Sequence, residues 1–308
     1  MKTLTFKLFL PLLIFLYACE SYENRVSELD TPVSGKINLV IDENIRPLAD
    51  LLVNSFEASY PDAFLIQKYN QEDEIIQLLY DDSARLALMT RPLQDEELAW
   101  FEKQKFIVEQ MMIGSDAVVF ILNKNNPDST FTTTQLLNIL SGKDTLWENI
   151  NQKNNAGKID IVFDNGKSCN IRYLTDTLLG NIPLGKNCFA VNSNKAVVEY
   201  VRDHPGAIGV VGLNWIGDKD NENDVLLRQS VKFAAVGTDT ATATTPHQSA
   251  LVTKKYPFTR HLWLVKIGKR AGLGTGFATF VMGDRGQLIV QKSGLAPAKP
   301  AERQVEIK

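Results

Sequence analysis

Hydrophobic positions in this chain follow two alternating patterns. Short, nearly continuous apolar runs such as residues 36–41 (KINLVI) and 84–89 (ARLALM) are typical of buried β-strands. Between such runs, apolar residues recur every three or four positions, as do Leu48, Leu52 and Phe56, which would share one face of an α-helix. This alternation predicts βαβ units, and therefore an α/β fold with mostly parallel sheets and helices on both faces.

The same patterns divide most of the chain beyond residue 35 into elements. Capping and breaking residues help to set the helix ends, since Pro47 suits a first helical turn and Pro61 lies in a break. The predicted strands cover residues 36–41, 63–69, 84–89, 106–113, 117–123, 159–163, 188–191, 207–211 and 232–236. The predicted helices cover residues 47–59, 72–80, 94–104, 132–140, 170–179, 194–203, 277–282 and 287–292, and residues 238–253 are expected to be irregular.

The loops that follow predicted strands are the candidates for a binding site. In largely parallel sheets, ligands bind beyond the carboxyl ends of the strands, close to helix N-termini. The loops in question are residues 42–46, 69–72, 90–92 and 164–170.

Loop 164–170 (DNGKSCN) combines residues that cap helices with residues that donate hydrogen bonds. Backbone N–H groups at a helix start, together with hydroxyl and amide side chains, can form a cradle for an anion. A plain helix cap at Ser168 is an equally good interpretation. The Gly-Lys-Ser sequence within this loop is not a phosphate-binding P-loop, because that motif needs a glycine where this chain has Ile161.

Arg91 ends a predicted buried strand, in the sequence Thr90-Arg91-Pro92. A guanidinium is suited to bidentate recognition of an oxyanion. The alternative is a surface arginine that pairs with Asp95 or Glu96.

The first 19 residues have the character of an export signal. Lys2 and Lys7 precede an apolar stretch over residues 8–18, which is too short to cross a bilayer and suits a signal peptide. The sequence Leu-Tyr-Ala-Cys that ends at Cys19 is similar to a lipobox. We therefore expect a signal peptide at 1–18, a lipidated Cys19 and a flexible tether at 19–35. The alternatives are an ordinary secretory peptide or a membrane anchor.

Composition narrows the functional classes. The chain has 308 residues and a formal net charge of −3, without a run of lysine and arginine, which argues against nucleic-acid binding. None of its three histidines has metal-ligand spacing, and no Gly-x-Ser-x-Gly motif occurs. We therefore expect no enzyme activity, no metal and no cofactor.

Cysteine and glycine patterns leave two further questions. Cys169 and Cys188 could form a disulfide in an oxidising compartment or remain free thiols. Cys169 could be a nucleophile at a helix N-terminus, although no partner histidine is indicated. The glycine-rich run 272–276 (GLGTG) does not match a dinucleotide-binding motif and indicates entry into a helix.

Seven stretches together resemble a known family. The stretch 131–142 (FTTTQLLNILSG) is the most specific, and 168–170 (SCN) lies where the family has Ser-Gly-Thr. The others are residues 40–49, 85–97, 116–123, 256–260 and 286–297. Taken in their order along the chain, these stretches resemble the phosphate-type substrate-binding proteins of ABC transporters, which have the periplasmic-binding-protein fold.

The resemblance implies two lobes joined by two crossing strands, with residues 36–117 plus 237–308 in the first lobe and 118–236 in the second. It implies a monomer that captures phosphate or a similar small oxyanion for an ABC permease, held by its lipid in the cell envelope and facing the periplasm. The alternative is an envelope or cell-surface interaction protein with a degenerate ligand site on the same scaffold. The implied ligand-binding residues are Asn44, Ile45, Arg46, Gln71, Thr90, Arg91, Asp164, Ser168, Cys169 and Asn170.

The ligand loops depart from the family pattern, because residues 69–72 (YNQE) are bulkier than the family's second loop and carry an acid, and Cys169 and Asn170 replace Gly and Thr. Two further departures change charge. The acid that accepts a proton from phosphate would fall at Arg91, and the arginine that precedes Ser-Gly-Thr would fall near Asp164. An exchange of Asp and Arg across one site could preserve its net charge, and this is a hypothesis for the ligand loops.

Overall fold

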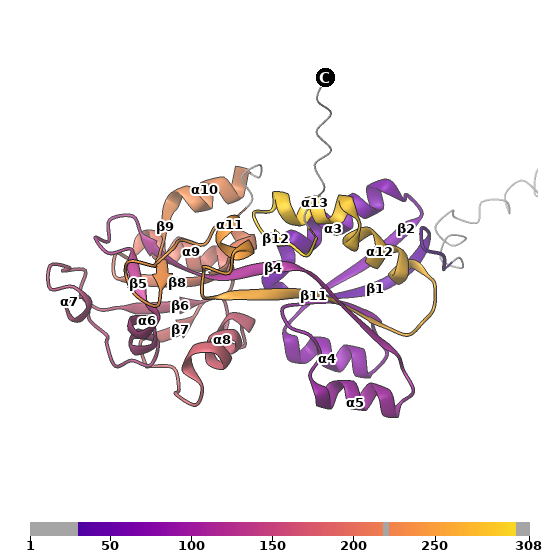
Figure 1. Cartoon of the computed structure of the whole chain (residues 1–308), viewed down its shortest axis with the longest axis horizontal. Helices are drawn as coiled ribbons and strands as arrows, with labels where there is room; N and C mark the ends of the chain where they lie inside the picture. The colour runs from indigo at the N-terminus through magenta and orange to yellow at the C-terminus, as the bar shows by residue number, and fades with distance from the viewer. Residues whose placement is uncertain (1–29, 218–221, 300–308) are drawn as a thin grey trace, which may run out of the picture.

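The computed structural model describes residues 30–217 and 222–299. Its main feature is a curled, ten-stranded mixed sheet with the strand order β2-β1-β3-β11-β4-β8-β6-β7, to which β9 and β12 add through β4 (Figure 1). The strands of this sheet are β1 (Gly35–Asp42), β2 (Ala63–Asn70), β3 (Leu86–Met89), β4 (Val108–Asn123), β6 (Asp160–Phe163), β7 (Cys188–Ala190), β8 (Ala207–Gly212), β9 (Val231–Phe233), β11 (Thr259–Ile267) and β12 (Ala296–Pro297).

Strands that are connected through helices pair in parallel, as the hydrophobic pattern predicted. β1 pairs in parallel with β2 and β3, and β6 pairs in parallel with β7 and β8. Antiparallel pairing is found around the long strand β4 and its neighbour β11. A second, two-stranded parallel sheet joins β5 (Thr130–Thr132) to β10 (Ala235–Gly237). The result is a two-lobed α/β fold whose lobes share one continuous sheet.

Strand β4 crosses from one lobe to the other. It pairs with β11 up to Ala117 and with β8 from Val118 onward. The prediction of two strands, 106–113 and 117–123, was wrong, because Gly114, Ser115 and Asp116 read as a break but continue the strand. At Gly114 an added Cβ would lie 2.8 Å from the Ala296 carbonyl oxygen. A glycine at this position therefore leaves the space in which β12 pairs with β4.

Helices cover both faces of each half of the sheet. In the first lobe α4 and α5 lie on one face, and α3, α12 and α13 lie on the other (Figure 1). These helices are α3 (Arg46–Ser59), α4 (Glu72–Tyr80), α5 (Asp95–Lys103), α12 (Leu273–Met282) and α13 (Asp284–Lys292). The second lobe carries α6 (Thr133–Leu140), α7 (Trp147–Ile150), α8 (Cys169–Leu174) with the π-helical turn η3 (Thr175–Leu179), α9 (Asn194–Asp203) and α10 (Glu222–Ser230).

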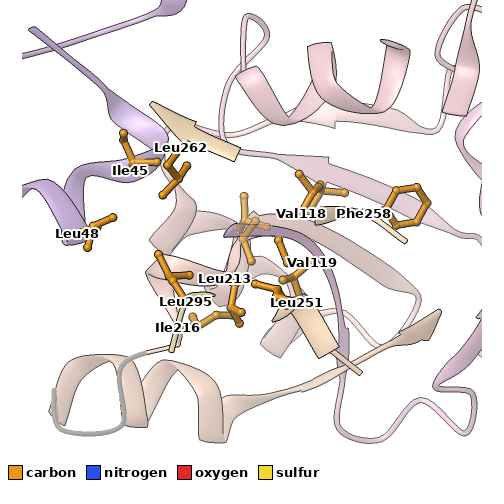
Figure 2. Packing of buried hydrophobic residues seen from close by; sticks show 14 of the residues in the cluster. Ile45, Leu48, Val118, Val119, Leu213, Ile216, Leu251, Phe258, Leu262 and Leu295 are labelled. Carbon is orange, nitrogen blue, oxygen red and sulfur yellow. The ribbon is translucent and has the colours of Figure 1, made fainter. Parts of the chain in front are cut away.

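One hydrophobic core runs through the junction of the lobes. Val118 and Val119 of β4 pack there with Leu262 of β11 and with residues from two short helices (Figure 2). Those helices are η4 (Leu213–Trp215) and α11 (Gln248–Val252), which contribute Leu213 and Leu251. All five side chains are at most 2% exposed, so apolar packing stabilises the junction of the lobes.

Several predicted boundaries need correction. Segment 232–236 is not one strand, because the Ala234 N–H bonds to Phe120 whereas the Ala235 N–H bonds to Ser129, which separates β9 from β10. Segment 238–253 is not wholly irregular, because α11 begins there after the cap residue His247. Its short apolar pattern is too weak to stand out from the Thr- and Ala-rich surroundings.

The export signal and Cys19 lie outside the described residues, as does the tether before residue 30. Across the parts of the chain that the structure covers, no helix combines the length and hydrophobicity needed to span a membrane. The residue limits of the two lobes stay a prediction.

Candidate functional site

Ten buried polar and thiol side chains meet where strands of both lobes end. Each residue is at most 3% exposed. We call this group the central polar cluster: Asp42, Asn44, Thr90, Asp116, Asp164, Ser168, Cys169, Asn170, Asn214 and Arg260. Six of the ten are site residues predicted from the sequence, because the ends of β1, β3 and β6 bring three of the candidate loops together.

Helix caps fix the ends of the loops. Asp42 caps the 3₁₀ helix η2 (Glu43–Ile45) by accepting the Asn44 backbone N–H at 2.9 Å, and it also accepts the Thr90 hydroxyl at 3.2 Å. Ser168 caps α8 by accepting the Asn170 N–H at 3.1 Å, and its own hydroxyl donates to Asp164. Each loop therefore presents a carboxylate and an amide in a fixed geometry.

Side-chain amides connect the two lobes. Asn44 of the first lobe donates to Asp164 at 3.2 Å and accepts from Asn170 at 2.8 Å. The backbone carbonyl oxygen of Asn44 accepts two more hydrogen bonds from the second lobe. Their donors are the side-chain amide of Asn214 and the indole of Trp215, each at 2.9 Å. The lobes are thus closed on each other in this structure.

Arg260 supplies the guanidinium of the cluster, and the loop-based prediction missed it. It lies on β11 directly across from Asp116 of β4, and the two form an ion pair of 2.9 Å. The Nη1 atom of Arg260 donates to Asn170 Oδ1 at 2.8 Å and to Cys169 Sγ at 3.1 Å. The only local sign of Arg260 was a charged residue next to an apolar run. Its place opposite Asp116 depends on the register of β4 and β11, which the local sequence does not show.

The cluster has more acids than bases. Asp42, Asp116 and Asp164 face the single guanidinium of Arg260. Burial raises the pKa of Asp42 and the pKa of Asp164 above the ordinary carboxyl value, although hydrogen bonds to each oppose the shift. Among the described residues, Asn214 Oδ1 is also buried without a hydrogen-bond partner. The cluster is therefore rich in acceptors that a proton-bearing ligand could satisfy.

A second charged group adjoins the cluster, where Glu72 of α4 meets Arg172 of α8. Arg91 binds Glu72 at 2.5 Å and Glu97 at 2.7 Å, and Arg172 of the second lobe binds Glu72 at 2.8 Å. Arg172 also reaches the Thr90 hydroxyl at 3.4 Å. We call Glu72, Arg91, Glu97 and Arg172 the mouth cluster. Arg91 pairs there with Glu72 and Glu97, not with Asp95 or Glu96 as the surface alternative supposed.

Three predicted site residues lie outside both clusters. The Ile45 side chain is fully buried in the hydrophobic core. Arg46 forms an ion pair with Glu43 and stacks 3.4 Å over the ring centre of Tyr69. Gln71 caps α4. Contact of these three with a ligand stays a prediction.

Cys169 and Cys188 are free thiols in this structure. Burial holds the pKa of Cys169 well above its ordinary value and raises that of Cys188 to about 11. Raised thiol pKa values disfavour the nucleophilic thiolate. Within the described ranges, no group of three or more His, Cys, Asp or Glu residues is arranged to hold a metal ion.

Comparison with known proteins places the chain in a family. A model of the PBP superfamily domain matches residues 26–285. The chain belongs to this superfamily. Its curated relatives include phosphate-binding protein PstS of Staphylococcus saprophyticus, which is 24% identical over 204 residues, or 64% of this chain and 60% of the relative. PstS of Staphylococcus aureus strain USA300 is 24% identical over 225 residues, or 70% of this chain and 65% of the relative. The matches thus span less than two thirds of these relatives' lengths.

Solved structures show the same fold. A substrate-binding protein from Clostridium perfringens with bound phosphate has a TM-score of 0.71 and 19% identity, and the match covers 86% of this chain and all of that one. An ABC-type phosphate transport receptor from Vibrio cholerae has a TM-score of 0.64 and 19% identity, over 84% of this chain and 99% of that one. These likenesses confirm the two-lobed binding-protein fold.

Proposed function

We propose that this chain is the solute-binding component of an ABC importer. It captures phosphate, or a similar small oxyanion that carries a proton, in the central polar cluster between its lobes. The observation that carries this proposal is the meeting of Arg260 with hydroxyl, amide and carboxyl groups from both lobes in one buried site. The names of the curated relatives and the phosphate bound in a structural neighbour support the same ligand class.

The donors of the cluster suit the oxygens of an anion. The Arg260 guanidinium, the Asn44 and Asn170 amides and the hydroxyls of Thr90 and Ser168 can all donate hydrogen bonds to oxyanion oxygens. In the closed structure these donors are directed at groups of the chain itself, such as Asp164. Opening of the lobes would break the hydrogen bonds that join them, such as Asn44 to Asp164 and Asn170 to Asn44, and closure around the anion would exclude water and strengthen each contact.

The acids of the cluster favour one kind of oxyanion over another. An ionised carboxylate can accept a hydrogen bond but cannot donate one, so it repels a fully deprotonated anion. Asp42 and Asp164 can instead accept the O–H of a protonated anion or hold a proton themselves, as their raised pKa values favour. Phosphate keeps an O–H group at neutral pH, whereas sulfate has none. The same residues therefore favour phosphate over sulfate.

Isothermal titration calorimetry with inorganic phosphate tests the proposal. We expect saturable binding with one anion per chain, no comparable heat with sulfate or molybdate, and loss of at least 100-fold in affinity for Arg260→Met. We also expect Ser168→Ala to weaken binding about tenfold, since it removes one hydroxyl donor. Arg85→Met is the matched control, because Arg85 is half exposed and paired with Asp82 away from the cluster. Absence of heat with phosphate would leave the fold intact and would favour the envelope interaction protein with a degenerate cleft.

We further propose that the protein is held in the cell envelope by a lipid on Cys19, faces the periplasm and delivers its ligand as a monomer to a permease. The signal-like residues 1–18 support this placement. Cys19→Ala should move the protein from the membrane fraction to the soluble fraction of cells. Retention of that variant in the membrane fraction would count against the lipid anchor.

We propose that Cys169 lies within the binding site but does not act as a nucleophile. Its thiol contacts Arg260 inside the cluster, and its raised pKa keeps it protonated. We therefore expect Cys169→Ala to bind phosphate with an affinity close to that of the unchanged chain.

A further inference from the structure

The glycine-rich run 272–276 opens α12, and its glycines are required for space, not for backbone conformation. Gly272 has a negative φ of −114°, which any residue could adopt. An added Cβ at Gly272 would lie 2.0 Å from the Asp30 carboxylate, and one at Gly276 would lie 1.6 Å from the Pro32 carbonyl oxygen. Because positions i and i+4 share one face of a helix, these two glycines form one flat seat. We call it the glycine seat.

The segment before β1 occupies the glycine seat. Asp30 Oδ1 accepts the Leu273 N–H at 2.8 Å, at the start of α12, and Asp30 Oδ2 pairs with Arg270 at 2.9 Å. Next along the chain, Thr31 and Ser34 close a turn with a backbone bond of 3.0 Å and a contact of 2.7 Å between their hydroxyls. The segment is thus held on the helix before the sheet begins at Gly35.

We propose that the glycine seat fixes the anchor-side segment of the chain to the first lobe, so that the lipid on Cys19 holds the first lobe and leaves the second free to move. This inference rests on the proposed lipid anchor. Cys19 and Asp30 are eleven positions apart, and this stretch can span at most roughly 40 Å when extended, whereas a free tether as far as Gly35 would span roughly 55 Å. The seat therefore shortens the tether and determines which lobe it holds.

Hydrogen exchange of the full chain tests the seat itself. Gly276→Ala places a methyl group where the Pro32 carbonyl lies, so we expect the amides of Thr31 and Leu273 to exchange at least tenfold faster. Gly166→Ala is the matched control, because an added Cβ at Gly166 meets no atom within 4 Å. Unchanged exchange in Gly276→Ala would overturn the proposal. Asp30→Ala provides a second test if Gly276→Ala does not fold, and it should accelerate exchange at Leu273.

Energy transfer to a membrane tests the consequence of the seat. The chain beginning at Cys19, with Cys188→Ser, is coupled through Cys19 to phosphatidylcholine vesicles that carry a headgroup acceptor. A donor dye on a non-natural amino acid replaces Leu288 in the first lobe or Ile182 in the second, since both side chains are exposed. We expect stronger transfer from position 288 than from 182, and Gly276→Ala should reduce the difference. Equal transfer from both positions would overturn the proposal.

Neither experiment uses phosphate. Failure of phosphate binding would therefore leave the seat untouched, and failure of the seat would leave the ligand proposal standing.

Discussion

Closure of the lobes should depend on Glu72 of the mouth cluster. Glu72 is in the first lobe and binds Arg172 of the second at 2.8 Å, and both side chains are largely shielded, with 13% and 27% exposure. Glu72→Gln keeps the shape of the side chain but removes its charge. Arg91 would retain Glu97 and Arg172 would retain Asp176, so neither arginine is left without a partner.

The magnitude follows from the one ion pair between the lobes that Glu72→Gln weakens, Glu72 with Arg172. A charge-assisted hydrogen bond contributes about 1.5–3 kcal/mol. The amide oxygen introduced by Glu72→Gln can still accept a hydrogen bond from Arg172, and the Arg172 side chain is partly exposed. We therefore expect the substitution to destabilise the closed state, relative to the open state, by about 1–2 kcal/mol. This corresponds to a decrease of about 5- to 30-fold in the ratio of closed to open molecules.

Asp73→Asn is the matched control for this prediction. Asp73 is the next residue of α4 and also pairs across the lobes, with Lys167 at 2.7 Å, but the two side chains are 59% and 72% exposed. Solvent and salt screen such a pair, so we expect little change on its removal.

Single-molecule energy transfer between dyes at the exposed positions Glu102 and Lys153 would measure closure, without phosphate and at increasing salt. We expect Glu72→Gln to raise the open population and Asp73→Asn to leave it nearly unchanged. Equal open populations in Glu72→Gln and the unchanged chain would refute the reasoning, and so would equal effects of the two variants.

Three further predictions concern the buried groups. Arg260→Met leaves Asp116 as a buried charge without its partner, so urea denaturation should show a loss of about 3–5 kcal/mol in the free energy of unfolding, and a loss below about 1 kcal/mol would contradict the ion-pair assignment. Because burial raises the pKa of Asp164, the folded state holds a proton that the unfolded state releases, and stability should fall as pH rises above the ordinary carboxyl value of 3.8. Asp164→Asn should show a shallower decline over the same range in urea midpoints, and an unchanged slope would argue against that titration. Iodoacetamide at neutral pH should label Cys169 and Cys188 slowly in the folded protein and rapidly in urea, and fast labelling of the folded protein would contradict the raised pKa values.

Local patterns predicted most of the elements because they depend on residues close together in sequence. The helices α4 and α9 begin and end where they were predicted to, since capping residues and apolar spacing agree. Strand β4 was divided wrongly because Asp116 resembles a loop residue, and its place in a buried strand depends on Arg260, which lies 144 positions away.

Local patterns also predicted those parts of the candidate site that lie in loops after strands. The rule that ligands bind beyond strand ends brought together Asn44, Thr90, Asp164, Ser168 and Asn170, and the structure confirms that these residues lie in one cluster. The crossing strands β4 and β11 contribute Asp116 and Arg260 to the same cluster. Their side chains depend on the antiparallel register of β4 and β11, which no local pattern specifies. Ligand binding by all of these residues stays a prediction.

The contact between Trp215 and Asn44 gives the molecule an optical signal of its own. The Trp215 indole N–H, in the second lobe, donates to the Asn44 carbonyl oxygen in the first, at 2.9 Å. Separation of the lobes would transfer that indole from a protein carbonyl to water, and a more polar environment shifts tryptophan emission to longer wavelengths. Trp147 is fully buried within the second lobe and would keep its spectrum. A change in intrinsic fluorescence that Trp215→Phe abolishes would therefore report the opening of the unlabelled protein.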